Sequence, residues 1–433
     1  MINQLYQSHV EEKLAVFQRL LQLSEFDGVL LGSGNQAYYF RDDINIPFKN
    51  SAYFAEWVPI SAFPGCYLLV AADSPLLLVP VVEDFWHSPP APLPEEVSAV
   101  LRVQHYRDIS ELKPLLEGKA MAFVGDQPPL EGMAHNPAQL LDGIDYHRAY
   151  KSAYQRHCIA EANRIAVAGH QAAIRGFFER GSELTLHHDY LRAINHTEAE
   201  MPYHNIVALN ENAAVLHHNH YEKMQPAQHR TLLVDAGAYY KGYCADITRT
   251  TAFDAGNDFA AMIAAMDAEQ MGIISMVKAD MSFVELHREA HRGVARTLAA
   301  FDLIKVSAEE AYESGITRTF LPHGLGHLLG VQVHDKGGYL ANESGAEVPP
   351  VDDFPTLRLR RDIAPNQVFT VEPGLYFIPM LLDKLRATAS DKVNWSRVEQ
   401  FIPFGGIRIE DNVSLNDDGS IANYTRDAFA AHR

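Results

Sequence analysis

The chain has 433 residues, 47% hydrophobic and 21% charged, a balance typical of a globular protein with room for two or three domains. Its formal net charge of −19 argues against nucleic acid or an anionic membrane as a partner. The three cysteines form no zinc-binding spacing, which favours a reducing compartment and therefore a cytoplasmic location.

The first 150 residues alternate helix and strand patterns. The N-terminal stretch contains acidic residues and predicts an amphipathic helix near residues 8–23, not a signal peptide. The most apolar stretch, residues 66–82, is interrupted by Pro75 and Pro80 and predicts two strands instead of a membrane span. We expect a small α/β domain over residues 1–150, with strands at FDGVLLGS, CYLLVAA, PLLLVPVV, LRVQHY and AMAFVGD.

The remainder, residues 151–433, has a different pattern. A long helix is predicted to run to about residue 180, because apolar residues recur there at helical spacing. Helices near residues 182–195, 256–279 and 282–300 then alternate with runs typical of strands. Strands and helices do not follow strict βαβ order, so we expect an α+β domain with a mostly antiparallel sheet.

Four carboxylates and one imidazole in this second part stand in short apolar stretches marked by glycine. The stretches are LLVDAGA, CADITRT, LPHGLGHLLG, FTVEPGLYF and GIRIEDN, each predicted as a strand or a strand edge. A carboxylate between apolar neighbours costs free energy to bury without a partner. Convergence of the five would suit two divalent cations held mainly by oxygen. The residues are Asp235, Asp246, His327, Glu372 and Glu410.

The spacing of the two aspartates supports this convergence. The segment RTLLVDAGAYYKGYCADITRT predicts a β-hairpin. With the loop centred between Tyr240 and Lys241, Asp235 lies opposite Asp246, with Cβ atoms roughly 5 Å apart. Two like charges would destabilise the hairpin there unless a cation lies between them. Either aspartate alone could instead cap a turn.

Histidines gather near these motifs. In LPHGLGHLLGVQVHD, three histidines are separated by glycines that permit close approach of the backbone. They are His323, His327 and His334. The segment AAVLHHNHY contains three more, of which we expect His218 and His220 to be structural or solvent-facing.

These motifs resemble those of the pita-bread metallopeptidases, and within them the bacterial Xaa-Pro dipeptidases (prolidases), a group that includes organophosphorus acid anhydrolases. The resemblance covers nearly the whole chain, including YYFRDDINIPFKNSAYFAEWVP in the N-terminal half. It implies a pita-bread catalytic domain with a curved, mostly antiparallel sheet. A creatinase-like α/β domain for dimerisation and substrate capping would precede it, and the protein would be a homodimer.

The resemblance also implies the ligand set. Asp235 would chelate one of two divalent metal ions, Asp246 and Glu410 would bridge both, and His327 and Glu372 would complete the second site. Manganese is implied first, and Co²⁺ or Zn²⁺ also suit a set of oxygens with one histidine. Glu372 would in addition carry a proton from the attacking water to the leaving nitrogen.

Further residues are assigned to the substrate by the same resemblance. His334 would donate to the scissile carbonyl oxygen or hold the substrate, and Arg358 would bind the C-terminal carboxylate, unless LRLRRD is only a surface charge run. Asp43, or its neighbour Asp42, is the candidate partner of the free amino group. The substrate set is completed by His217, His323, Tyr203 and Arg408, the last at a position where the family has an arginine behind the ligands.

The implied activity is hydrolysis of Xaa-Pro dipeptides, with proline released after attack by a hydroxide shared between two metal ions. Arg358 and the DDINIPF loop favour a dipeptide because both would close the pocket. The alternatives are an Xaa-Pro aminopeptidase acting on longer peptides, an organophosphorus acid anhydrolase, and a metal-free binding module or amidinohydrolase that would lack the carboxylates. The segment NSAYFAEWVP departs from the prolidase pattern and leaves the preferred first residue of the dipeptide open.

Overall fold

The computed structural model describes residues 2–60, 62–86 and 90–432. The chain divides into two compact units. The first comprises Met1–Cys158, Lys241–Tyr243 and Leu340–Glu347, and the second contains the rest of the chain. No helix in the described ranges combines the length and apolar character needed to cross a membrane.

The first unit contains a mixed six-stranded sheet in the order β4-β3-β2-β1-β5-β6. The five strands predicted from the sequence are all present, and β2 and β3 form the expected antiparallel pair. The first helix begins earlier than predicted because Tyr6 and Val10 share a buried face with Phe17 and Leu20. The strands are β1 Gly28–Gly32, β2 Tyr67–Ala71, β3 Leu76–Pro80, β4 Arg102–Tyr106, β5 Met121–Val124 and β6 Ala134–His135. The helices are α1 Ile2–Leu23, α2 Ala52–Ala55, α3 Glu95–Val100, α4 Lys113–Leu116 and α5 Ala138–Arg148.

In the second unit, β8 pairs antiparallel with β7 and β11, β15 with β12 and β16, and β13 with β14. Two three-stranded sheets, β11-β8-β7 and β12-β15-β16, meet at an isolated bridge between Thr248 and Glu410. The strands are β7 Ile206–Leu209, β8 Thr231–Asp235, β9 Tyr239–Tyr240, β10 Tyr243–Cys244, β11 Thr248–Ala252, β12 Val368–Val371, β13 Gly374–Tyr376, β14 Gly406–Arg408, β15 Asp411–Leu415 and β16 Ile421–Asn423.

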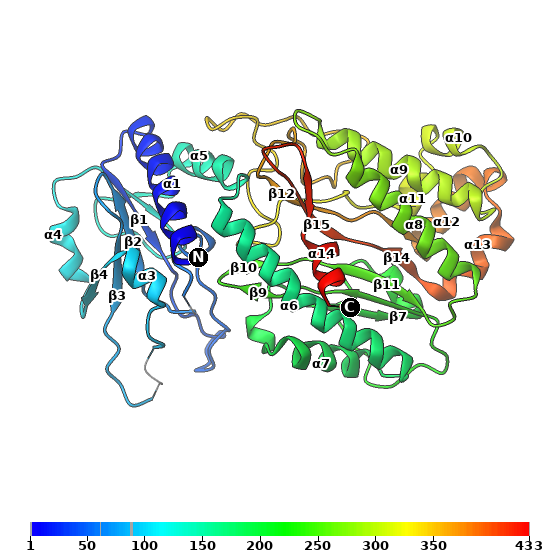
Figure 1. The fold of residues 1–433 in the computed structure, drawn as a ribbon, viewed down its shortest axis with the longest axis horizontal. Coiled ribbons are helices and arrows are strands. Elements are labelled where there is room, and N and C mark those ends of the chain that lie inside the picture. Colours follow the sequence, from blue (N-terminus) through cyan, green and yellow to red (C-terminus); the bar gives the residue numbers. More distant parts are fainter. Residues whose placement is uncertain (1, 61, 87–89, 433) are drawn as a thin grey trace. The chain divides into compact units, whose positions relative to one another are not determined.

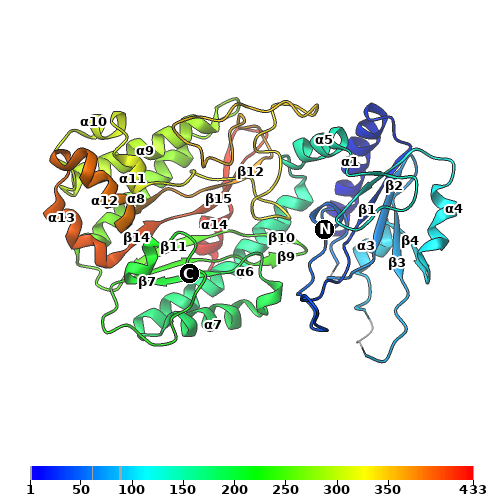
Figure 2. The ribbon, with the colours of Figure 1, turned by 180° about the vertical axis from the view of Figure 1, so that it is seen from behind.

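Helices of the second unit cover these strands. Figures 1 and 2 show the strands between the pair α6 and α7 on one side and the pair α8 and α9 on the other. These four long helices agree with the predicted ranges to within a few residues, and side chains of Ser182, Asn257 and Ser282 cap α7, α8 and α9. The helices are α6 Ala153–Phe178, α7 Glu183–Ile194, α8 Asp258–Ser275, α9 Phe283–Ala300, α10 Ala308–Glu313, α11 Thr317–Phe320, α12 Pro379–Ala389, α13 Trp395–Phe401 and α14 Tyr424–Ala431.

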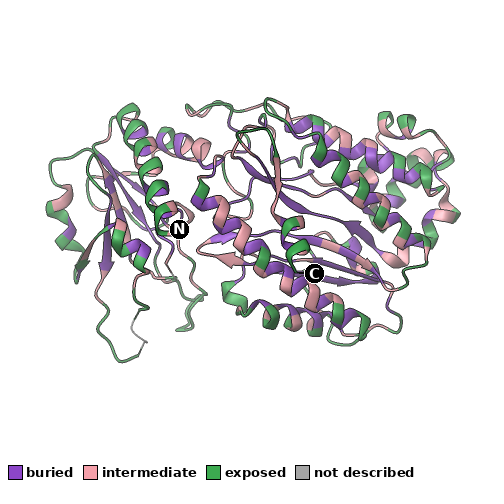
Figure 3. Cartoon of the chain, viewed as in Figure 1, coloured by how far each residue is buried: buried purple, intermediate pink, exposed green. Residues whose placement is uncertain are grey.

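One hydrophobic cluster of the second unit lies between α6, α7 and the sheet. Phe177 and Tyr190 pack with Val207 and Val234, and all four side chains are buried. Figure 3 shows that the strands of this unit are largely buried along their length. Polar side chains at the strand ends are therefore held on a rigid support.

Candidate metal centre

The hairpin that carries the first two aspartates is present, but its register differs from the prediction. Thr248, and not Asp246, pairs with Asp235 between β8 and β11. The turn falls at Lys241 and Gly242, which both have positive φ, as a two-residue type I′ turn requires. The predicted opposition of the two aspartates is therefore wrong by two positions. Because side chains alternate with a period of two, Asp246 still lies on the same face as Asp235, as a diagonal neighbour.

Tyr203 joins the two aspartates. Its hydroxyl oxygen lies 2.8 Å from Asp235 Oδ1 and 2.6 Å from Asp246 Oδ1, within hydrogen-bonding distance of both. On the other side of Asp235, Oδ2 accepts a hydrogen bond of 2.6 Å from Arg408. Tyr203, predicted to line the pocket, thus contacts both carboxylates directly.

His327 comes from an irregular segment that runs beside β12. Its backbone N–H donates to Thr370 Oγ1 at 3.0 Å, and Thr370 N donates to the His327 carbonyl at 2.9 Å. Gly326 makes this approach possible, because a Cβ at that position would lie 2.1 Å from the Thr370 carbonyl oxygen. Nδ1 is 3.0 Å from the Leu328 carbonyl, so Nε2 is left to face the carboxylates.

The imidazole brings the remaining ligands together. His327 Nε2 lies 3.4 Å from Asp246 Oδ2 and 3.6 Å from Glu372 Oε1. Glu410 lies between β14 and β15, and its Oε2 accepts a 2.7 Å hydrogen bond from Thr248. The ligand atoms of Asp246, His327 and Glu410 lie within 4.8 Å of one another, and all three residues are buried. The five predicted ligands are therefore neighbours.

The carboxylates of this cluster are ionised only at a cost in free energy, which a bound cation would offset. Burial, reinforced by the neighbouring carboxylates, raises the pKa of Glu410 well above its usual value. Burial likewise raises the pKa of Asp235, and it raises the pKa of Glu372 to about 7 although His327 opposes the shift. Four carboxylates around one imidazole, two of them buried and two partly buried, are the donor set that divalent cations such as Mn²⁺, Co²⁺ or Zn²⁺ accept. The residues present therefore fit the metal ions that the sequence implied.

A second layer of side chains supports the cluster. Arg408 is buried and donates to Asp235, to the Tyr376 hydroxyl at 2.9 Å and to Thr248 Oγ1 at 3.1 Å. The Tyr376 hydroxyl also lies 2.8 Å from His323 Nε2. Tyr376 was missed in the sequence, although its even spacing from Glu372 in EPGLY was a signal that it points to the same side.

The residues predicted to bind substrate occupy three places. The ring of His334 packs edge-on against His327, with centroids 4.5 Å apart. His217 and Arg358 are exposed. Burial is the largest cause that lowers the pKa of His334, followed by the charge of His327; the charges of Arg358 and His217 add to the shift. Both residues therefore lie near His334. Asp43 lies in an exposed loop of the first unit, where Asp42 Oδ1 accepts its backbone N–H.

A buried carboxylate that the sequence did not reveal holds the loop of His217. Glu183, at the start of α7, accepts hydrogen bonds of 2.8–2.9 Å from four donors on either side of His217 along the chain. The donors are Leu209 N, Asn212 Nδ2, His218 Nε2 and Glu222 N. Burial alone would raise the pKa of Glu183, but these bonds outweigh it and lower the pKa. The structural role expected for His218 agrees with this contact.

The fold and the cluster together define a pita-bread protein with a candidate metal centre. The model of metallopeptidase family M24 matches residues 157–417, and that of the Xaa-Pro dipeptidase N-terminal domain matches residues 4–146. The chain belongs to metallopeptidase family M24.

Relatives and solved structures agree with this assignment. An Xaa-Pro dipeptidase of Pseudoalteromonas translucida (strain TAC 125) is 42% identical over 430 residues, covering 98% of each chain. One of Colwellia psychrerythraea is 40% identical over 431 residues, covering 98% of this chain and 97% of the relative. The low-pH form of aminopeptidase P from E. coli superposes with a TM-score of 0.72 at 21% identity, over 96% of this chain and 95% of that chain. This last likeness shows the α+β pita-bread fold.

Proposed function

We propose that this metallopeptidase hydrolyses Xaa-Pro dipeptides with two divalent metal ions, Mn²⁺ first among them. The observation that carries the proposal is the buried cluster of Asp246, His327 and Glu410, with Asp235 and Glu372 beside it, in a chain about 40% identical, over nearly its full length, to Xaa-Pro dipeptidases. Asp235, Asp246, Glu410, His327 and Glu372 would hold the ions. When bound, these ions would supply an activated water and polarise the scissile carbonyl.

The chain's own residues would do the remaining chemistry. Glu372 Oε would accept the proton of the attacking water and return it to the leaving nitrogen, which becomes the secondary amine of proline. His334, beside His327, would donate to the carbonyl oxygen as negative charge develops there. The exposed guanidinium of Arg358 would bind the free carboxylate with two parallel hydrogen bonds. That contact would distinguish a dipeptide from a longer peptide.

Two other activities use the same site. The structural likeness to aminopeptidase P favours an Xaa-Pro aminopeptidase as the second candidate. An organophosphate triester would present phosphorus to the same activated water, so we propose a weak side activity on such esters. We further propose a cytoplasmic homodimer whose N-terminal domain, residues 1–150, serves dimerisation and capping; light scattering of the purified protein tests the dimer.

The proposed function is tested with chelator-treated protein, with and without added Mn²⁺. The substrates are Gly-Pro, Ala-Pro and Leu-Pro, compared with Leu-Gly and Ala-Pro-Ala. We expect Mn²⁺-dependent release of proline from the three Xaa-Pro dipeptides only. Cleavage of Ala-Pro-Ala as fast as Ala-Pro would replace the proposal by the aminopeptidase, and cleavage of neither would reject both.

A further inference from the structure

Asn412, two residues after Glu410, pairs through its side chain with the backbone of Asp246. Asp246 N donates to Asn412 Oδ1 at 3.1 Å, and Asn412 Nδ2 donates to the Asp246 carbonyl at 2.5 Å. Two strands normally exchange such a pair of bonds between peptide groups. Here a carboxamide takes the place of one peptide, so the backbone of a predicted ligand is held by a side chain 166 residues away.

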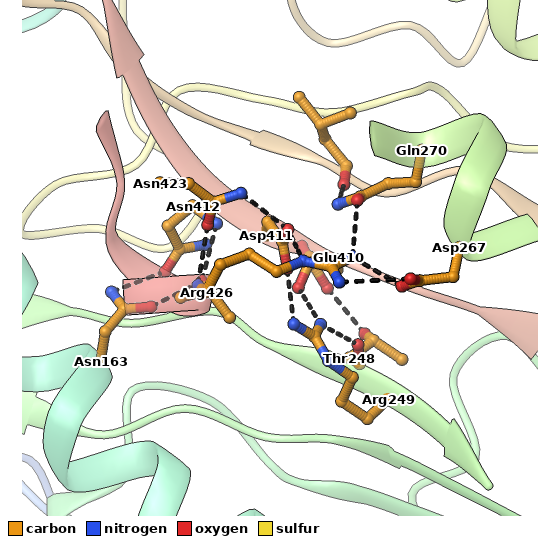
Figure 4. Close-up of polar contacts among 12 residues, drawn as sticks. Asn163, Thr248, Arg249, Asp267, Gln270, Glu410, Asp411, Asn412, Asn423 and Arg426 are labelled. Carbon is orange, nitrogen blue, oxygen red and sulfur yellow. Dashed lines mark hydrogen bonds and ion pairs between the residues drawn. The ribbon is translucent and has the colours of Figure 1, made fainter. Parts of the chain in front are cut away.

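The orientation of this carboxamide is itself fixed by buried groups (Figure 4). Asn163 Nδ2 donates to Asn412 Oδ1 at 3.0 Å and also to the Ile159 carbonyl at 2.9 Å. The Thr425 hydroxyl donates to Asn163 Oδ1 at 2.7 Å and accepts from Asn412 N at 2.9 Å. Because each atom has a partner of the right kind, the amide of Asn412 cannot be reversed without losing hydrogen bonds.

The preceding residue anchors Glu410 in a similar way. Asp411 Oδ1 accepts a hydrogen bond of 2.7 Å from Arg249 Nη2, and Arg249 Nη1 donates to the Glu410 carbonyl at 2.8 Å (Figure 4). Asp411 Oδ2 accepts from Arg426 at 2.7 Å and from Asn423 at 2.8 Å. The first turn of α14 therefore braces the strand that follows Glu410.

We propose that Asn412 is a positioning residue of the metal centre. Asp235, Asp246 and Glu410 repel one another before a cation binds, and their separation is set by how firmly their backbones are held. Asn412, oriented by Asn163 and Thr425, holds the Asp246 peptide against this repulsion. Partners behind a ligand commonly change metal affinity 10–100-fold when they are removed. The inference rests on the metal site of the proposed function.

The test replaces Asn412 by an acid of the same size. In Asn412→Asp, a carboxylate oxygen faces the Asp246 carbonyl, so the donor is lost and repulsion replaces it. Binding of Mn²⁺ alone is titrated into metal-free protein, and we expect the Kd to rise about 10–100-fold. We expect kcat for Ala-Pro to fall while KM stays within about twofold, because Asn412 is fully buried and offers no surface to a substrate.

Ser414→Ala is the matched control. Ser414 is buried two residues further along β15, on the same face. Among the described residues, its hydroxyl hydrogen-bonds only to the Leu415 carbonyl, at 3.4 Å. We expect its Mn²⁺ affinity to equal that of the parent. The melting temperature of each metal-free variant separates a general loss of stability from a loss of metal affinity.

A second pair keeps the test decisive if Asn412→Asp does not fold. Thr425→Val removes the orienting hydroxyl and should weaken Mn²⁺ binding several-fold, whereas Thr425→Ser keeps the hydroxyl and should restore it. Parent-like Mn²⁺ affinity in both Asn412→Asp and Thr425→Val would overturn the inference. A parent that binds Mn²⁺ but cleaves no Xaa-Pro peptide would contradict only the proposed function, and the Mn²⁺ comparison would still decide the role of Asn412.

Discussion

At the residue scale, Asp246 is a predicted ligand that contacts three other groups of the site. It is buried, its carboxylate lies near His327 and Tyr203, and its backbone is hydrogen-bonded to the side chain of Asn412. Asp246→Asn keeps the volume and removes the charge. We expect Mn²⁺ affinity to fall at least 100-fold and metal-dependent hydrolysis to be lost, since a neutral amide is a poor ligand for a hard cation. Metal titration and peptide hydrolysis measure this, and the exposed Asp254→Asn serves as the control.

Arg358 tests recognition of the substrate carboxylate. We expect Arg358→Ala to raise KM for Ala-Pro by roughly 10–100-fold, since a charge-assisted bond contributes about 1.5–3 kcal/mol. Mn²⁺ affinity should not change. Arg360→Ala, in the same charge run but stacked on Tyr339 at 4.2 Å, should have little effect on KM. Equal effects of both variants would mean that the run acts only as surface charge.

The sequence alone was sufficient to single out the five candidate ligands, which the structure brings together, because each is a charged or imidazole group in an apolar, glycine-marked stretch. The residues that hold the ligand and substrate segments in place have no such local pattern. Glu183 and Asn412 are ordinary polar residues in their local context. Their roles arise from donors and acceptors 26–39 and 166 positions away, respectively, which no local pattern encodes.

At the element scale, the hairpin of β8 and β11 shows how a register can be missed. A loop centred before Lys241 and one centred after it place the same side chains on each face of the hairpin, so the apolar alternation cannot distinguish them. The deciding property is the positive φ at both Lys241 and Gly242, which favours a glycine at the second turn position. The turn type, and not the hydrophobic pattern, therefore set the pairing.

Gly326 lets the His327 segment approach β12. Gly326→Ala would place its Cβ 2.1 Å from the Thr370 carbonyl oxygen and force the two segments apart. We expect a loss of about 1–3 kcal/mol in stability together with weaker Mn²⁺ binding. Gly272 in α8 has no neighbour within 4 Å of an added Cβ, so Gly272→Ala should stabilise the helix by about 1 kcal/mol. Thermal unfolding and metal titration of both variants check the contrast.

Glu183 fixes the loop between the 3₁₀-helical turn Asn210–Ala214 and Glu222. Glu183→Gln retains the size but turns an amide donor toward N–H groups, so the loop of His217 loosens. We expect KM for Ala-Pro to rise roughly tenfold with Mn²⁺ affinity unchanged, as the loss of one or two buried hydrogen bonds implies. The exposed Glu179→Gln, four residues earlier, should match the parent. A parent-like KM in Glu183→Gln would show that the loop needs no such anchor.

At the scale of the whole molecule, length and periodicity predicted the long helices well. The shorter helices α12, α13 and α14 were not predicted, because 7–11 residues provide few repeats of an apolar pattern. The predicted domain boundary at residue 150 lies in the link between α5 and α6, whereas the compact units divide inside α6, after Cys158. The end of the first domain therefore differs according to whether it is defined by the start of α6 or by the compact units, and the predicted boundary stays a prediction.

Buried neutral histidines link the stability of the fold to pH. Burial lowers the pKa of His9, His170 and His291 to about 4, so the unfolded chain takes up their protons first as the pH falls. Each contributes stability that is complete above its unfolded pKa of 6.5 and is lost as the pH falls from there toward 4. Carboxylates whose pKa is raised in the folded state have the opposite effect, because their contribution to stability is lost as the pH rises. The contribution of one histidine is therefore isolated by comparing its variant with the parent.

His170 provides that difference. Between pH 7 and pH 5, we expect the free energy of unfolding of metal-free His170→Gln to fall by roughly 1–2 kcal/mol less than that of the parent. Urea titrations at both pH values measure this, with the exposed His220→Gln as the control. Identical pH dependence in His170→Gln and the parent would mean that His170 does not resist protonation in the folded state.

The bridge between Thr248 and Glu410 joins two sheets that carry different predicted ligands, Asp235 and Asp246 on one side and Glu372 and Glu410 on the other. A bound cation is therefore a cross-link between halves of the unit, in addition to its chemical role. Such a link stabilises only the folded state, in which both halves are in place. Amide hydrogen exchange should then show the two sheets opening independently in the metal-free protein and as one cooperative block once Mn²⁺ is bound.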